Sequence, residues 1–184
     1  MKKIKLGSIL CELNDRSVEN NQFEILTSSQ DGIVSQKDYF NKQVASDNNI
    51  GYKIIKNGEF TYRSMSDTGC FYINRLTDYE IGIVSPAYPV FRIASKEILP
   101  EFLEMYFQSN YFQHQISNQS TGSTRLALKY NKLSKLDIDV PEKNYQHQII
   151  DTLNKIKALI SNEENQLVLF DELIKSRFVD LFYY

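Results

Sequence analysis

The residue types best suited to chemistry stand in two short stretches, Ser85–Tyr88 (SPAY) and Ser120–Tyr130 (STGSTRLALKY). SPAY is close to the Ser/Asn/Asp-Pro-Pro-Tyr motif with which DNA amino-methyltransferases hold the exocyclic nitrogen of a flipped base. Such enzymes also bind S-adenosylmethionine on a glycine-rich turn, and the seven glycines of this chain never fall close together. We therefore interpret SPAY as a turn between strands, with an independent methyltransferase as the alternative.

The second stretch contains a small, polar segment, Gly122–Arg125. Its backbone amides suit an anion, since successive N–H groups form concave anion sites; a turn that joins a domain to its connector is the alternative. The chain has no match to the phosphate-binding Gly-x4-Gly-Lys-Ser/Thr loop and no Glu-x-Lys triplet of a restriction-type nuclease. Two histidines in helical or pre-helical settings also argue against Ser-His-Asp catalysis. We expect no catalytic centre and no cofactor in this chain.

Cysteine use and the start of the chain bear on its compartment. Cys11 and Cys70 stand far apart without a Cys-x-x-Cys spacing, so neither zinc nor a disulfide framework is predicted. The opening MKKIKLGSIL has no sustained apolar run and no small-residue cleavage site. We expect a cytoplasmic protein with no membrane partner.

The net charge of −2 hides a division along the chain. Residues 1–136 carry 16 Lys and Arg against 14 Asp and Glu (+2), and residues 137–184 carry 5 against 9 (−4). A near-neutral body holds phosphates only weakly by charge. The charge therefore permits a nucleic-acid partner without indicating one.

Short alternating runs broken by turn residues fill the chain from Ile4 to about Arg92, and alternation over four to eight residues predicts strands. Lys56–Phe60 (KNGEF) places an Asn-Gly pair between two such runs, which predicts a hairpin. ILPEFLEMYFQSNYFQHQI (98–116) then changes to a helical period, with Pro100 suited to a first helical turn. One helix or two short ones are expected to pack on a twisted, mainly antiparallel sheet. LSKLDIDVP (133–141) reads as a last strand, and the fold class is α+β.

A different pattern covers the C-terminal part of the chain. Apolar residues recur there in alternating steps of four and three, as in a coiled-coil seam. No glycine or proline interrupts Tyr145 to about Phe182, which predicts one helix of about 57 Å. Because a long helix with one apolar face is unstable alone, we expect a partner helix; packing back on its own domain is the alternative. The predicted interface residues are Ile149, Leu153, Ile156, Ile160, Leu167, Phe170, Ile174 and Leu181.

Five stretches in this order resemble the specificity subunit of type I restriction-modification systems. They are KLGSIL (5–10), GEFTYRSMS (58–66), GIVSPAYPVF (82–91), STGSTRLALKYNKLSKLDIDVP (120–141) and a glutamine, Gln146, followed by the long helix. Gln146 matches the glutamine that leads the family's conserved helix, because Ile149, Leu153 and Ile156 then fall on its apolar positions. Tyr145 stands where the family usually has glutamate, and PEKNY (141–145) replaces a more proline-rich link.

The resemblance implies a target recognition domain over residues 1–141 and a conserved spacer helix over residues 142–184. It implies a noncatalytic DNA-recognition subunit of a type I restriction endonuclease and adenine-N6 methyltransferase complex. The implied partners are double-stranded DNA, methyltransferase subunits that bind S-adenosylmethionine, and a restriction/translocase subunit. A complete family subunit has two recognition domains and two helices. A chain with one of each is therefore expected to form a homodimer and to read an interrupted palindrome.

Base-reading residues are expected on loops at the edge of the sheet, where Arg, Lys, Asn and Gln offer bidentate hydrogen bonds. The candidates are Gln36, Lys37, Lys42, Gln43, Arg63, Ser64, Asn74 and Arg75. Ser123, Thr124 and Arg125 are predicted to touch phosphates, which positions a protein on DNA without specifying sequence. The alternative to DNA recognition is a coiled-coil interaction module that never meets DNA.

Overall fold

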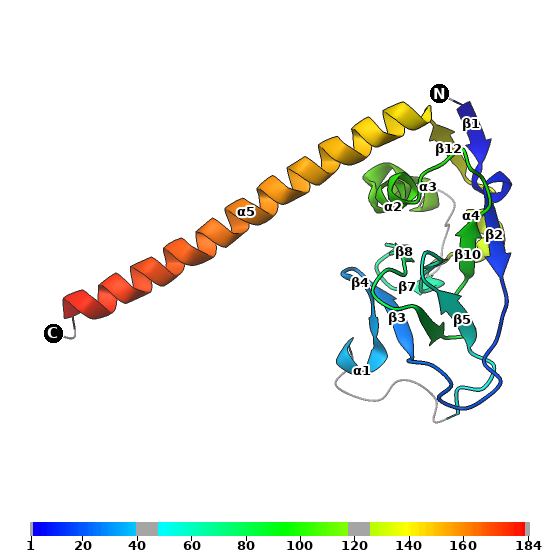
Figure 1. Ribbon diagram of the computed structural model, residues 1–184, viewed down its shortest axis with the longest axis horizontal. Coiled ribbons are helices and arrows are strands. Elements are labelled where there is room, and N and C mark those ends of the chain that lie inside the picture. The colour runs from blue at the N-terminus through cyan, green and yellow to red at the C-terminus, as the bar shows by residue number, and fades with distance from the viewer. Residues whose placement is uncertain (1, 40–47, 118–125, 183–184) are drawn as a thin grey trace. The chain divides into compact units, whose positions relative to one another are not determined.

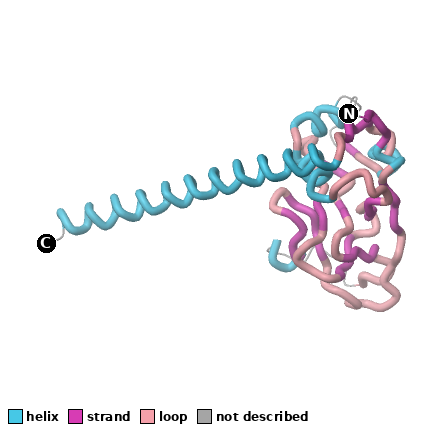
Figure 2. Tube along the Cα trace, turned by 45° about the horizontal axis from the view of Figure 1, so that its top comes forward, coloured by secondary structure: helices cyan, strands magenta, loops and turns pink. Residues whose placement is uncertain are grey.

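The computed structural model describes residues 2–39, 48–117 and 126–182. The chain divides into two compact units, Met1–Lys143 and Asn144–Tyr184, where the sequence placed a boundary between residues 141 and 142. We call the first unit the head and the second the tail. The head holds every strand that the structure describes, and the tail is helical (Figures 1 and 2). Within these described ranges, no helix has both the length and the apolar character that crossing a membrane requires.

The strands of the head pair antiparallel in segments of two to four residues. The predicted α+β class with antiparallel strands is confirmed, but the described strands are divided among five small sheets instead of one. The largest sheet has the order β2-β10-β6-β8, formed by β2 (Leu10–Leu13), β10 (Val90–Ile93), β6 (Phe60–Thr61) and β8 (Asn74–Arg75). The two-stranded sheets are β1 (Lys2–Lys5) with β12 (Asp137–Val140), β3 (Leu26–Ser29) with β4 (Gly32–Ser35), β5 (Lys53–Lys56) with β9 (Ile81–Val84), and β7 (Met65–Ser66) with β11 (Leu126–Ala127).

The hairpin predicted at KNGEF is wrong. A turn does form there, with Gly58 at φ +83° and the Glu59 N–H donating to the Lys56 carbonyl at 3.0 Å. The flanking strands do not pair with each other, however, because β5 pairs with β9 while β6 pairs with β8 and β10. The turn is held by distant residues instead: the Asn57 N–H donates to the Glu80 carbonyl and the Gly58 N–H to the Leu76 carbonyl.

Two helices follow β10, as one of the predicted arrangements had it. α2 (Pro100–Gln108) has Pro100 in its first turn, and α3 (Asn110–Ser117) begins two residues after α2 ends. Their apolar faces are buried, and α2 is tied to β12 by a 2.8 Å hydrogen bond from the Tyr106 hydroxyl to the Asp137 carbonyl. The other described helices of the head are single turns: η1 (Leu6–Ser8), α1 (Gln36–Tyr39) and α4 (Tyr130–Leu133).

SPAY forms the turn between β9 and β10 that the sequence predicted. The Tyr88 N–H donates to the Ser85 carbonyl at 2.9 Å, and the next strand begins at Val90. The segment is therefore explained as a connection between two strands.

An aromatic cluster fills the core where α2 and α3 meet the largest sheet. Phe91 lies at its centre and is fully buried. It stacks on Phe60 at 5.5 Å and meets Phe107 edge to face at 6.2 Å. Phe107 in turn contacts Phe112 at 4.9 Å, which links α2 to α3. Pairs of this geometry add stability beyond the area that they bury.

The tail consists of α5 (Lys143–Phe182), a continuous helix of 40 residues and about 60 Å. The predicted long helix is therefore confirmed, beginning two residues earlier than expected. From Leu153 onward every predicted seam residue is exposed in the single chain. Further exposed apolar residues lie off the seam, among them Leu159, Leu169, Leu173 and Val179.

Replacing Phe91 with alanine is expected to lower the free energy of unfolding of the head by about 3–5 kcal/mol, because it opens a cavity among three other rings. Phe91→Leu retains most of the volume and should cost less than half as much. Urea titrations followed by near-ultraviolet circular dichroism, which reports aromatic packing, measure both. Equal losses for the two variants would contradict the central role of this ring.

Candidate nucleic-acid interface

The chain leaves the core at Arg63. Phe60, Thr61 and Tyr62 are fully buried, and burial raises the pKa of the Tyr62 hydroxyl, which keeps it protonated and neutral. Arg63 is exposed and makes no hydrogen bond or ion pair with any described residue. Its guanidinium therefore keeps five donors available to a ligand.

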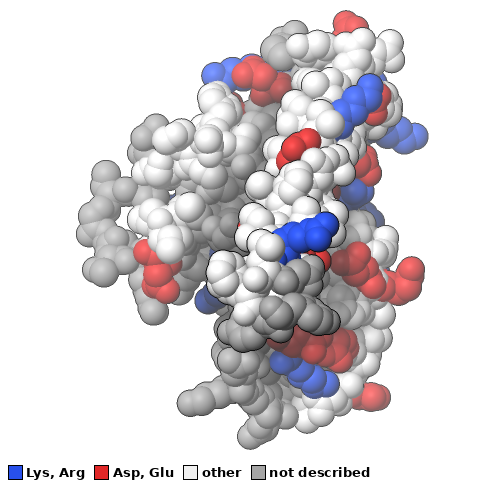
Figure 3. Space-filling model, turned by 90° about the vertical axis from the view of Figure 1, so that its left-hand side faces the viewer, with Lys and Arg blue, Asp and Glu red and all other residues white. Residues whose placement is uncertain are grey.

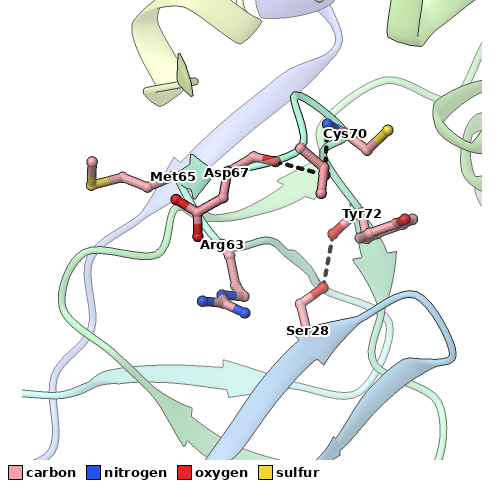
Figure 4. A pocket seen from close by; sticks show the side chains of 8 residues that line it. Ser28, Arg63, Met65, Asp67, Cys70 and Tyr72 are labelled. Carbon is pink, nitrogen blue, oxygen red and sulfur yellow. Dashed lines mark hydrogen bonds between the residues drawn. The ribbon is translucent and has the colours of Figure 1, made fainter. Parts of the chain in front are cut away.

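Arg63 lies in a pocket of about 220 Å³. Figure 4 shows Arg63 in the middle of the group, with Asp67 on one side and Ser28 and Tyr72 on the other. The volume is below the range of about 300–1,000 Å³ for small-molecule sites, so it suits the edge of a base better than a whole cofactor. The lining residues are Ser28, Arg63, Met65, Ser66, Asp67, Thr68, Cys70 and Tyr72, and we call this site the Arg63 pocket.

Hydrogen bonds between neighbouring residues give the pocket loop a fixed shape. The Gly69 N–H donates to the Ser66 hydroxyl at 3.0 Å, and the Ser66 and Thr68 hydroxyls lie 3.3 Å apart. Gly69 has φ +84°, a conformation that favours glycine. On the other wall, the Ser28 hydroxyl donates to the Tyr72 carbonyl at 2.8 Å. The side chains at the pocket are therefore presented by a backbone that is already ordered.

The loop is fastened to the rest of the head at both ends. At its start, β7 pairs with β11 and the Leu128 N–H donates to the Ser64 carbonyl at 2.9 Å. At its end, the Gln113 carboxamide on α3 accepts from the Phe71 N–H at 3.0 Å and donates to the Phe71 carbonyl at 2.9 Å. One glutamine side chain thus replaces the strand partner that Phe71 lacks.

Of the six predicted base readers within the described residues, the Arg63 pocket contains only Arg63. Gln36 and Lys37 lie in the short helix α1, where a loop was expected. The Lys37 ammonium is mostly exposed and lies 3.6 Å from the Glu24 carboxylate. Ser64 is half-buried. The part of these three residues in DNA binding stays a prediction.

Asn74 and Arg75 have partners inside the head. The buried Asn74 amide donates to the Ser28 hydroxyl at 2.9 Å, and so supports a wall of the pocket. Arg75 forms ion pairs with Glu101 at 2.9 Å and Glu104 at 3.4 Å. Both also line a second pocket, together with Asp31, Asp78 and Glu104. Its carboxylates would repel DNA phosphates. In the single chain both side chains support the fold, and their contact with DNA stays a prediction.

Lys42, Gln43, Ser123, Thr124 and Arg125 lie outside the described residues, so their predicted DNA contacts are untested. Sequence reasoning missed most of the pocket, above all Asp67, Tyr72 and Ser28. The polar run Ser64–Thr68 directly after Arg63 was a signal for the first of these. Ser28 carried no signal, because it comes from a strand far away in the sequence.

Basic and acidic side chains are mixed on the surface. On the face in Figure 3, Lys and Arg are interspersed with Asp and Glu, and the described residues form no broad basic field there. Nor do the described residues hold a cluster of three or more His, Cys, Asp or Glu suited to a metal ion. The local arrangement at the Arg63 pocket offers hydrogen-bonding groups of both kinds, which is what recognition of base edges requires.

Comparisons with known proteins agree with this architecture. No family model matches the chain. A curated relative, the Type I restriction enzyme HindI specificity subunit of Haemophilus influenzae, is 27% identical over 136 residues, covering 70% of this chain and 29% of the relative. The chain is similar in sequence to a type I specificity subunit. It spans less than a third of that relative's length.

Solved structures of such subunits have the same fold. The HsdS subunit from Thermoanaerobacter tengcongensis matches with a TM-score of 0.57 and 14% identity, over 88% of this chain and 38% of that one. The type I S subunit from M. genitalium matches with a TM-score of 0.55 and 16% identity, over 88% and 40%. A chain from a structural study of type I R-M complex assembly reaches 0.61 at 14% identity, over 90% and 40%. The predicted resemblance to type I specificity subunits is confirmed, in sequence and in fold.

Replacing Gln113 with alanine is expected to loosen the pocket loop, because the Phe71 N–H and carbonyl lose their partner at a cost of about 1–3 kcal/mol. Hydrogen exchange of the Phe71 amide should rise about 5- to 150-fold, a factor of ten for each 1.4 kcal/mol. Alkylation of the exposed Cys70 by iodoacetamide should also accelerate, whereas that of the exposed Cys11 serves as the internal control. Unchanged exchange at Phe71 would show that other contacts fix the loop.

Proposed function

We propose that this chain recognises one half of a bipartite sequence in double-stranded DNA and directs methyltransferase and restriction subunits to it. The observation that carries the proposal is the twofold likeness to type I specificity subunits: in sequence over 70% of the chain, and in fold over 88–90% of it. The chain acts as a noncatalytic reader. Base modification with S-adenosylmethionine belongs to the partner subunit, and the site of action is the cytoplasm.

The Arg63 pocket supports a reading role for the head. Arginine is the side chain that most often reads guanine, through two hydrogen bonds to O6 and N7. The Arg63 guanidinium has no described partner that would have to be displaced, and its loop is held by β11 and Gln113. Binding through such a loop loses little conformational entropy.

The tail supports an assembly role. In the single chain its seam, from Leu153 to Leu181, is exposed to water. Burial of a Leu or Ile side chain stabilises by about 1.5–3 kcal/mol, so the seam favours a partner helix. A second copy of the chain supplies a helix with the same pattern. Two heads joined in this way read the two halves of an interrupted palindrome.

Two polar residues interrupt the seam and favour one orientation of the two helices. Glu163 and Arg177 occupy seam positions by the alternating steps of four and three. In a parallel, in-register pair each residue would face its own copy and bring like charges together. An antiparallel pair avoids both repulsions. That arrangement also has the two-fold symmetry of a palindromic site.

Replacing Arg63 with alanine is expected to weaken binding to the target duplex by about 1–3 kcal/mol, or about 5- to 150-fold, and to change non-specific binding little. The target is found first, from the methylome of cells that carry the chain with its methyltransferase. Fluorescence anisotropy with target and scrambled duplexes then measures both affinities.

Arg92→Ala is the matched control, since it removes the same exposed side chain from β10, away from the Arg63 pocket. Equal losses for the two variants would remove Arg63 from the set of base readers. A methylome without any modified motif would contradict the proposed function itself and favour an interaction module.

Light scattering at tens of micromolar is expected to give a mass of about 43 kDa, twice the 21.5 kDa of the chain. Leu167→Glu should shift the mass to that of one chain, because it buries a charge in the seam. Leu169→Glu should leave the dimer intact, although Leu167 and Leu169 are equally exposed, at 65% and 63%. A monomeric parent chain, or equal effects of the two substitutions, would contradict pairing through this seam.

A further inference from the structure

The charged groups of the Arg63 pocket are one of each sign. Arg63 supplies a guanidinium and Asp67 supplies a carboxylate, and no ion pair joins the two. A site for a phosphate gathers donors and positive charge, and a carboxylate in it would repel the ligand. The edge of a base pair, in contrast, is neutral overall and presents donors and acceptors side by side. The composition of the pocket therefore fits a base pair better than the DNA backbone.

The two groups match the two halves of one particular base pair. In the major groove guanine presents two acceptors, O6 and N7, which suit the fork of an arginine. Its partner cytosine presents a donor, the N4 amino group, which suits a carboxylate. Adenine and thymine offer no such combination, because the adenine amino group lies next to an acceptor on the same base and thymine has no major-groove donor.

We infer that the Arg63 pocket reads a single G·C pair, with Arg63 on guanine and Asp67 on the cytosine amino group. This assignment rests on the proposed function and adds to it the identity of one base pair in the half-site. It also makes Asp67 a specificity determinant, since a carboxylate placed against any base without a major-groove donor is left desolvated and unpaired.

The backbone around Asp67 supports a positioned carboxylate. Asp67 stands in the middle of the Ser66–Gly69 turn, which is closed by the hydrogen bond from the Gly69 N–H to the Ser66 hydroxyl. The adjacent Ser66 and Thr68 hydroxyls lie 3.3 Å apart and fix the residues on either side of it. Figure 4 shows the Asp67 and Arg63 side chains beside each other at the pocket. A ligand thus meets both charged groups without reorganising the loop.

The test is a binding selection from a pool of random duplexes with the full chain, its methyltransferase present, followed by sequencing of the bound DNA. The parent chain should fix G·C at one position of each half-site. Asp67→Asn should reduce discrimination at that position alone by about 5- to 150-fold, because the amide no longer offers a purely accepting group to cytosine. Arg63→Ala should relax the same position.

Asp139→Asn is the matched control, since it removes the same charge from an exposed position on β12 outside the pocket, and its selected sequences should equal those of the parent. A variant that merely disturbed the fold would lose preference at all positions, so relaxation confined to one position marks a direct role. If the parent selects a sequence whose G·C positions do not respond to either substitution at the pocket, the inference is overturned while the proposed function stands. If the parent selects no sequence at all, both are overturned.

Discussion

The free energy of α5 depends on burial of its seam, because an isolated helix gains little from its own hydrogen bonds in water. Forty residues are held in one helix whose apolar side chains, from Leu153 to Leu181, face solvent in the single chain. The head has no such requirement, since its aromatic cluster is already closed around Phe91. The two units therefore obtain their stability in different ways: the head by folding, and the tail by association.

In the head, single side chains connect small sheets that share no continuous hydrogen-bond ladder. Asn74 ties β8 to the residues of β3, Gln113 ties α3 to the end of the pocket loop, and Tyr106 ties α2 to β12. Buried polar groups of this kind are costly unless every donor and acceptor is satisfied. Their pairing makes the arrangement specific, because a shifted strand would leave several of them without a partner.

The sequence was most informative where the pattern was local. The long helix, the helical turn at Pro100 and the SPAY turn all depend on residues a few positions apart, and all three agree with the structure. The hairpin at KNGEF failed, because the amides of Asn57 and Gly58 bond to residues about twenty positions away. Local turn chemistry sets the shape of such a turn, but long-range pairing decides which strands lie next to it. The pocket follows the same rule: Arg63 was found from its loop, whereas Ser28 reached it from a strand that no local pattern connects to it.

The loop of the Arg63 pocket separates anchoring from presentation residue by residue. Tyr62, Phe71 and Ile73 are buried and carry the packing, while the side chains between Arg63 and Cys70 mostly face solvent and carry the chemistry. Exposed positions accept substitution at little cost to stability. Mutations can therefore accumulate at the tip of this loop and give the protein a new target, while the scaffold beneath it retains its ancestral packing. Preference for DNA and persistence of the fold are then free to evolve at different rates.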